Sequence, residues 1–144
     1  MRITELQIGD WVLINPWDNQ KPHHPCKVVA INYNSYRGKD YCDWIDSDYW
    51  DEISPSDIAP IPLTEDILTE NGFKYDGDAA LCSKHVLIFY GDKKHGWEVN
   101  IDRDDLEPYG KSITTHVKYV HELQHALRIC GVKKEIVIKK EGEG

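Results

Sequence analysis

The sequence lacks several features that would assign a protein to a class at once. It has no apolar run near the roughly 18 residues that cross a bilayer. Its first residues have neither a basic start followed by an apolar stretch nor a cleavage signal. It also lacks a Gly-rich phosphate loop, a nucleophile elbow, a Cys–His pairing and an internal repeat. We therefore expect a cytoplasmic protein that does not enter a membrane.

Cysteines and basic residues are scarce. The four cysteines lie far apart without Cys-x-x-Cys spacing, which in a reducing compartment indicates free thiols. Lys and Arg total 17 against 25 Asp and Glu, giving a net charge of −8. This charge disfavours a nucleic-acid partner, because the overall field repels phosphates. The length of 144 residues allows one domain or two small ones.

The first 60 residues alternate short β-rich runs with polar turns. Strands are expected at 11–14 and 26–32, two more at 41–45 and 49–53, and a last short one at 58–61 after a helical turn. Gly9-Asp10-Trp11-Val12 followed by Lys27-Val28-Val29-Ala30-Ile31 resembles the start of Src-homology-3-like barrels of the Tudor and KOW kind. We predict such a small β-barrel over residues 1–60.

Aromatic residues are concentrated in this first half. A cluster left exposed would form a groove for a peptide or a methylated cation, with Trp11, Trp44 and Trp50 as the candidate binding residues. The alternative is that most of the aromatics fill a small core. The other members of the group are Trp17, Tyr33, Tyr36, Tyr41 and Tyr49.

Residues 61–144 predict an α+β domain. Thr64 is placed to cap a short helix that Asn71-Gly72 ends, and four strands of an antiparallel meander follow at 73–75, 81–82, 86–90 and 97–101. Apolar residues then recur at helical spacing from Ile113 to Cys130, predicting one long amphipathic helix over 114–130 that packs on the meander. A final strand is expected at 135–139.

This helix contains His121-Glu122-Leu123-Gln124-His125, the His-Glu-x-x-His pattern of zinc metallopeptidases. In that pattern His121 and His125 bind zinc and Glu122 is the general base for a metal-bound water. On a helical wheel both histidines fall away from the apolar stripe, facing either a cleft or water.

A catalytic zinc also needs a third protein ligand. Only 19 residues follow His125, and Arg128 and Gly131 occupy the positions where the extended motif continues with Gly and His. Upstream donors such as His85, His95 or His116 remain open. The alternative to a zinc site is a solvated helix face with coincidental histidines.

Three segments together resemble an uncharacterised family of gut-bacterial and mobile-element proteins. They are Ile3–Leu6 with Ile8–Val12, Pro60–Leu68 with Gly72-Phe73, and Tyr119-Val120-His121-Glu122-Leu123-Gln124. The family helix typically has Gln at the position of Glu122 and Asn at that of His125. The resemblance therefore implies that the zinc pattern belongs to this chain and is not a feature of the family. It gives no activity, cofactor or partner that could be carried over to this chain.

The sequence thus predicts a non-enzymatic α+β protein without a cofactor, whose partner is another protein. The competing hypothesis is a minimal zinc hydrolase with His121 and His125 as ligands and Glu122 as base. A nucleic-acid module built on the barrel is a third, weaker hypothesis.

Overall fold

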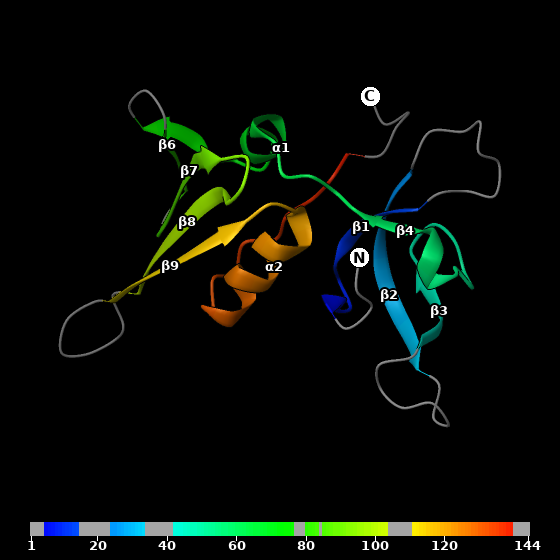
Figure 1. The fold of residues 1–144 in the computed structure, drawn as a ribbon. Coiled ribbons are helices and arrows are strands. Elements are labelled where there is room, and N and C mark those ends of the chain that lie inside the picture. The colour runs from blue at the N-terminus through cyan, green and yellow to red at the C-terminus, as the bar shows by residue number, and fades with distance from the viewer. Residues whose placement is uncertain are drawn as a thin grey trace. The chain divides into compact units, whose positions relative to one another are not determined.

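The computed structural model describes residues 5–14, 24–33, 42–76, 80–83, 85–103 and 111–139. The chain forms two compact units (Figure 1). Unit 1 consists of Met1–Ile61 with Val137–Gly144, and unit 2 of Pro62–Ile136. The sequence placed the boundary one residue earlier and assigned the end of the chain to the second unit. Within the described residues, no helix has the length and apolar character needed to cross a membrane.

Unit 1 is built on a four-stranded antiparallel sheet with the order β3-β2-β1-β4. Its strands are β1 (Trp11–Ile14), β2 (His24–Tyr33), β3 (Cys42–Ser47) and β4 (Ile58–Pro60). A single 3-10 turn, η2 (Pro55–Asp57), precedes β4 as the sequence predicts, and its first residue is the proline. The expected strand at 49–53 is wrong except for Ile53, which pairs with Ile45 in an isolated bridge.

The inward side of this sheet follows the alternation of each strand. Val12 and Ile14 on β1 are buried together with Cys26 and Val28 on β2. A register shift between Val28 and Ala30 interrupts the pairing with β3, and such a bulge bends a strand. Among the described residues the ladder stays open at β3 and β4, so closure into a barrel is not confirmed.

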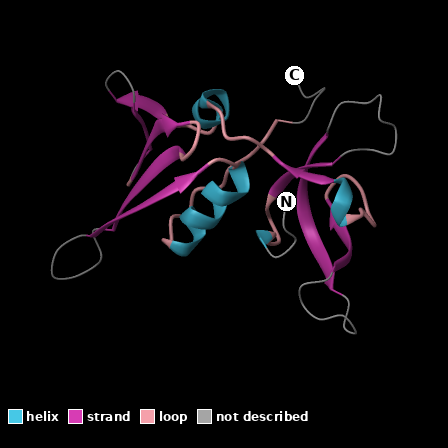
Figure 2. Ribbon diagram, viewed as in Figure 1, coloured by secondary structure: helices cyan, strands magenta, loops and turns pink. Residues whose placement is uncertain are grey.

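Unit 2 contains a five-stranded meander in sequence order, β5-β6-β7-β8-β9. Its strands are β5 (Lys74–Asp76), β6 (Ala80–Ser83), β7 (Val86–Asp92), β8 (Gly96–Arg103) and β9 (Lys111–Val117). The four strands predicted at 73–101 are confirmed as β5 to β8. The helix before them is α1 (Glu65–Glu70), where the Thr64 hydroxyl accepts a hydrogen bond from the N–H of Ile67 at 3.2 Å, as predicted. The mixed α+β class is confirmed (Figure 2).

The predicted helix over 114–130 is wrong in its first six residues, 114–119. The structure has strand β9 up to Val117, and the helix α2 spans only Val120–Ile129. Apolar residues four positions apart, Ile113 and Val117, also lie on one face of a strand, and the β-branched residues between them favour extended backbone. Pairing of Val117 with Trp97 on β8 therefore outweighs the helical pattern. α2 packs against β9 (Figure 1).

The expected final strand over 135–139 is also wrong, because the described residues there belong to no ladder. The alternation that suggested it is nevertheless present in burial. Ile136 and Ile138 are buried on either side of the exposed Val137. The alternation of apolar residues therefore indicates which side chains are buried, but it does not indicate a β-strand.

Candidate functional site

The His-Glu-x-x-His segment occupies the first turns of α2. His121 is only 2% exposed, so the expectation that both histidines lie away from the core is wrong for this residue. The ring of His125 is half-buried and lies edge-on to that of His121, with centroids 5.5 Å apart. On its other side the His121 ring lies nearly parallel to Tyr119, at 6.0 Å. His121 is therefore part of a packed aromatic row.

Glu122 is engaged by the backbone at the start of the same helix. Its Oε1 accepts hydrogen bonds from the N–H of Lys118 at 2.9 Å and from the N–H of Tyr119 at 3.0 Å. This is the side-chain half of a capping box, which satisfies N–H groups that a helix start leaves without partners. A carboxylate held in this way serves helix initiation, and a general base would need it turned toward a bound water.

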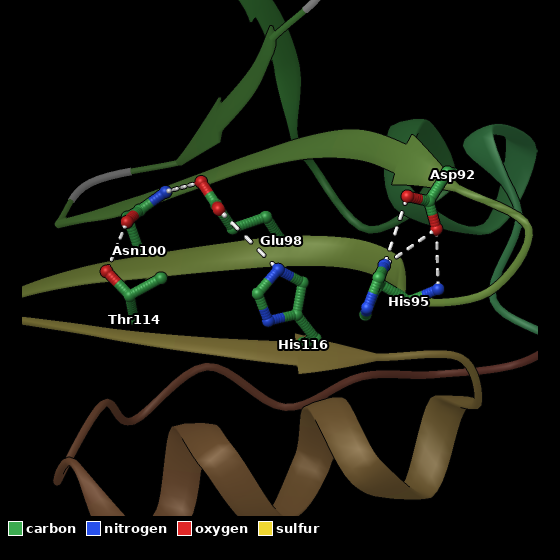
Figure 3. Close-up of polar contacts among 6 residues, drawn as sticks. All are labelled: Asp92, His95, Glu98, Asn100, Thr114 and His116. Carbon is green, nitrogen blue, oxygen red and sulfur yellow. Dashed lines mark hydrogen bonds and ion pairs between the residues drawn. The ribbon is translucent and has the colours of Figure 1, made fainter.

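Among the described residues, no third ligand joins His121 and His125 in a metal-binding group. Within the described ranges, no group of three or more His, Cys, Asp and Glu side chains is placed to hold a metal ion. Of the upstream donors, His95 and His116 lie near each other in unit 2, with ring centroids 5.8 Å apart. His95 is in the turn before β8, and His116 is on β9 (Figure 3).

Two separate sets of polar contacts involve these rings (Figure 3). His95 Nδ1 lies 3.0 Å from both carboxylate oxygens of Asp92, and His116 Nε2 lies 3.6 Å from Glu98 Oε1. Beyond Glu98, the Asn100 amide donates to Glu98 Oε2 at 3.2 Å and accepts from the Thr114 hydroxyl at 2.6 Å. Glu98 and His116 are direct cross-strand partners.

The chemistry of these contacts is that of a solvated sheet surface. Glu98 and Asn100 alternate with the buried Val99 and Ile101 on β8 and so face away from the apolar side of the sheet. The side chains of Asp92 and His95 are 58% and 55% exposed. The hydrogen bonds from His95 lower the pKa of the Asp92 carboxyl below its ordinary value. Exposed pairs of this kind contribute little to stability, and no nucleophile stands beside either imidazole among these residues.

Cysteine chemistry is also disfavoured at Cys42, the half-buried thiol at the start of β3. Burial raises the pKa of this thiol above its usual value, and this effect outweighs that of its hydrogen bonds with the backbone of Asn32 and Trp44. Because the thiolate is the reactive form, Cys42 stays protonated and unreactive near neutral pH.

Unit 1 presents a different kind of surface at the turn after β3, residues 48–52, which we name the aromatic turn. The buried side chain of Ser47 organises it. Ser47 Oγ accepts hydrogen bonds from the N–H of Trp50 at 2.8 Å and of Tyr49 at 3.2 Å, and donates to the Trp50 carbonyl at 2.9 Å. The turn is also tied to β2, since the Lys27 N–H donates to Asp48 Oδ1 at 2.8 Å.

The side chains of the aromatic turn are exposed although its backbone is fixed. Tyr49 is 50% exposed and Trp50 44%. The Tyr49 ring stacks flat on the imidazole of His24, at the start of β2, with centroids 3.8 Å apart and planes 9° apart. Trp50 lies 5.7 Å from Tyr49 at a tilt of 57°. Three rings from two segments distant in sequence therefore form one surface.

The candidate tryptophans are separated by the fold. Trp11 is 5% exposed, so its side chain is buried and offers little surface to a ligand. Trp44 and Trp50 are exposed, and only Trp50 contacts the stacked pair. Trp17, Tyr36 and Tyr41 lie outside the described residues, and so does the side chain of Tyr33.

The segment that carries the aromatic turn is strongly acidic. Residues 42–57 contain six carboxylates and no Lys or Arg: Asp43, Asp46, Asp48, Asp51, Glu52 and Asp57. Asp46 has a local structural role, because its Oδ1 accepts the Glu52 N–H at 2.9 Å, and Glu52 adopts a positive φ of 53°. Asp51 and Glu52, the two residues that follow Trp50 in the chain, are exposed. Aromatic faces and negative charge here coincide on one short hairpin.

Sequence reasoning missed the contribution of His24, which it placed in a loop. The available signal was the adjacent pair His23-His24, which directly precedes the β-rich run at 26–32. The density of carboxylates over 42–57 was also present in the sequence. Comparison of the chain with models of protein families, with curated proteins and with solved structures gives no match.

Proposed function

We propose that this protein is a non-enzymatic binding module that recognises a basic segment of another protein through the aromatic turn of unit 1. The observation that carries the proposal is the stacked and exposed group of His24, Tyr49 and Trp50 on an acidic hairpin. Aromatic faces attract cations through their quadrupole, and nearby carboxylates add long-range attraction. A cytoplasmic accessory role in a bacterium, phage or mobile element fits this activity.

We also propose that unit 1 is a Src-homology-3-like module, and the order of its elements supports this. β4 follows a single 3-10 turn and pairs with β1, and β1, β2 and β3 follow each other as an antiparallel meander. Small β-modules of this kind bind extended peptides on exposed aromatic side chains. The aromatic turn joins β3 to Ile53, at one end of that meander.

The zinc-hydrolase hypothesis receives less support. Glu122, which would have to activate water, accepts two backbone hydrogen bonds at the helix start, and His121 is buried. A nucleic-acid partner is also less favoured, because the exposed aromatics lie among carboxylates that repel phosphate.

The experiment that tests the proposal measures binding of a short fluorescent peptide, in which glycine alternates with a mixture of lysine and arginine, to the full chain at low salt. The comparison peptide has glutamate at the basic positions. We expect saturable binding of the basic peptide only, with an affinity that falls as salt is added. Equal binding of both peptides, or of neither, would contradict the proposal.

The site is tested with the double variant Tyr49→Ala/Trp50→Ala. Both side chains are exposed, so the fold is expected to persist, as circular dichroism would report. Loss of two aromatic contacts is expected to weaken binding by about tenfold or more. The matched control is Tyr75→Ala on β5 of unit 2, where Tyr75 is 49% exposed against 50% for Tyr49. An equal loss of affinity in the Tyr75→Ala control would show that the peptide binds exposed aromatic side chains nonspecifically.

A further inference from the structure

We infer that the aromatic turn selects arginine over lysine in its partner. This inference rests on the proposed function and adds the identity of the cation that the surface reads. Both side chains satisfy a requirement for positive charge, so the selection must come from the geometry of the rings and carboxylates.

The first observation is that the surface is organised for flat groups. Tyr49 already stacks on a planar, nitrogen-bearing ring, the imidazole of His24, at 3.8 Å and 9°. The His24 Nδ1 lies 2.8 Å from the Pro25 carbonyl, and since a carbonyl can only accept, this nitrogen carries the proton and the ring is fixed in place. A guanidinium is also planar and stacks on aromatic faces, whereas the ammonium of lysine is a compact, strongly hydrated charge.

The second observation is the pair of acidic residues that follows Trp50 in the chain. Asp51 and Glu52 directly follow Trp50 and are exposed. A guanidinium has five N–H donors in a rigid fork, so it can stack on Trp50 and still donate in its plane to a neighbouring carboxylate. An ammonium placed over a ring has no flat face to match, and its donors radiate from one point.

The third observation is that the turn is held before any ligand arrives. Ser47 makes three hydrogen bonds to the backbone of Tyr49 and Trp50, and Lys27 and Asp48 exchange two more, at 2.8 and 3.0 Å. A fixed pair of rings loses little conformational entropy on binding. The stronger stacking of arginine than of lysine therefore appears as a difference in affinity. A mobile turn would adapt to either side chain and discriminate less.

The test compares two peptides of equal length and charge, one alternating glycine with arginine and the other glycine with lysine, by isothermal titration of the full chain. We expect the arginine peptide to bind about five- to tenfold more tightly. Equal affinities, or a preference for lysine, would overturn this inference and leave the proposed function standing. No binding of either peptide would overturn both.

The variants locate the preference. In Tyr49→Ala/Trp50→Ala the ratio of the two affinities is expected to fall to about one, while Tyr75→Ala keeps it. A ratio that survives in the double variant would place arginine selection elsewhere and overturn the inference, even if the absolute affinity had fallen. Replacing Asp51 and Glu52 with Asn and Gln is expected to weaken binding of both peptides but of the arginine peptide more, because a guanidinium loses a charged partner with two acceptor oxygens that matches its fork of N–H donors.

Discussion

The carboxylate of Glu122 accepts the N–H of Tyr119 at 3.0 Å, so the acid of the His-Glu-x-x-His pattern is a helix cap. The same spacing that suggests a general base, three residues into the helix from its N-cap, is also the spacing of a capping box. The same short pattern is therefore compatible with a metal site and with a helix cap, and the hydrogen bonds of the Glu side chain distinguish the two.

The first prediction concerns this cap. Glu122→Ala removes the oxygen that accepts both backbone hydrogen bonds at the start of α2 and is expected to lower the free energy of unfolding by about 1 kcal/mol. Glu122→Gln keeps an acceptor oxygen and is expected to lose less than half of that amount. Urea unfolding followed by circular dichroism measures both. An unchanged stability in the alanine variant would contradict the assignment of Glu122 as a cap.

Metal removal gives the second prediction. Because Glu122 is held by the backbone and His121 is buried, a chelator is expected to leave the Tm of protein purified without a metal-affinity tag unchanged. Elemental analysis should find no stoichiometric zinc. Near one zinc per chain, lost in His125→Ala, would restore the hydrolase hypothesis.

The third prediction uses two glycines with similar backbones and different surroundings. Gly96 has φ +78° and a Cβ there would lie 2.5 Å from the Val117 carbonyl oxygen, whereas Gly131 has φ +71° and open space around it. Gly131→Ala should cost only the strain of a left-handed alanine, about 1 kcal/mol. Gly96→Ala should add a steric clash across β8 and β9 and cost about 2–4 kcal/mol. Thermal unfolding of both variants tests the difference, and equal costs would contradict it.

A fourth prediction concerns Ser47. Ser47→Ala removes one acceptor and one donor that fix the aromatic turn, and it leaves the N–H groups of Tyr49 and Trp50 without that partner. We expect a loss of about 1–2 kcal/mol in unfolding free energy, together with weaker binding of the basic peptide. Ser56→Ala, in the exposed turn η2, is the control and should change neither. Tight binding by a destabilised Ser47→Ala would show that the rings do not need this support.

The pH dependence of the Asp92–His95 pair gives the fifth prediction. Hydrogen bonds from His95 lower the pKa of Asp92, so the ionised carboxylate is favoured in the folded state. Its contribution to stability is then fully present above the unfolded carboxyl pKa, near 3.9, and is lost as the pH falls through the lower folded value. A carboxyl-carbon NMR titration should show this pKa rising toward its ordinary value in His95→Ala. His116→Ala, which alters the neighbouring ring, should leave it in place.

Much of the fold follows from the sequence because its signals are local. Thr64 and the acidic first turn specify α1, and polar turns separate the strands of the meander. The failure at 114–117 has a physical cause. The spacing of Ile113 and Val117 fits a helix and a strand equally. The strand forms because this segment pairs with β8, and the sequence of the segment alone does not show that a partner strand is present.

The candidate site was less predictable for a similar reason. Exposed aromatics can be counted in the sequence, but which of them remain uncovered depends on the assembled sheet. Trp11 and Trp50 look alike in the sequence, and the fold buries one and exposes the other. The stacking of His24 on Tyr49 joins residues from different segments, so no local pattern predicts it.

The division of the chain has a consequence for its synthesis. Unit 2 is continuous from Pro62 to Ile136, whereas unit 1 takes residues from both ends of the chain. A ribosome therefore synthesises all of unit 2 before the last residues of unit 1, and domains generally fold as units. The hairpin with the aromatic turn is made early but belongs to the unit that is completed last. A released chain truncated after residue 136 should accordingly protect α2 and the meander from proteolysis, while unit 1 stays less protected.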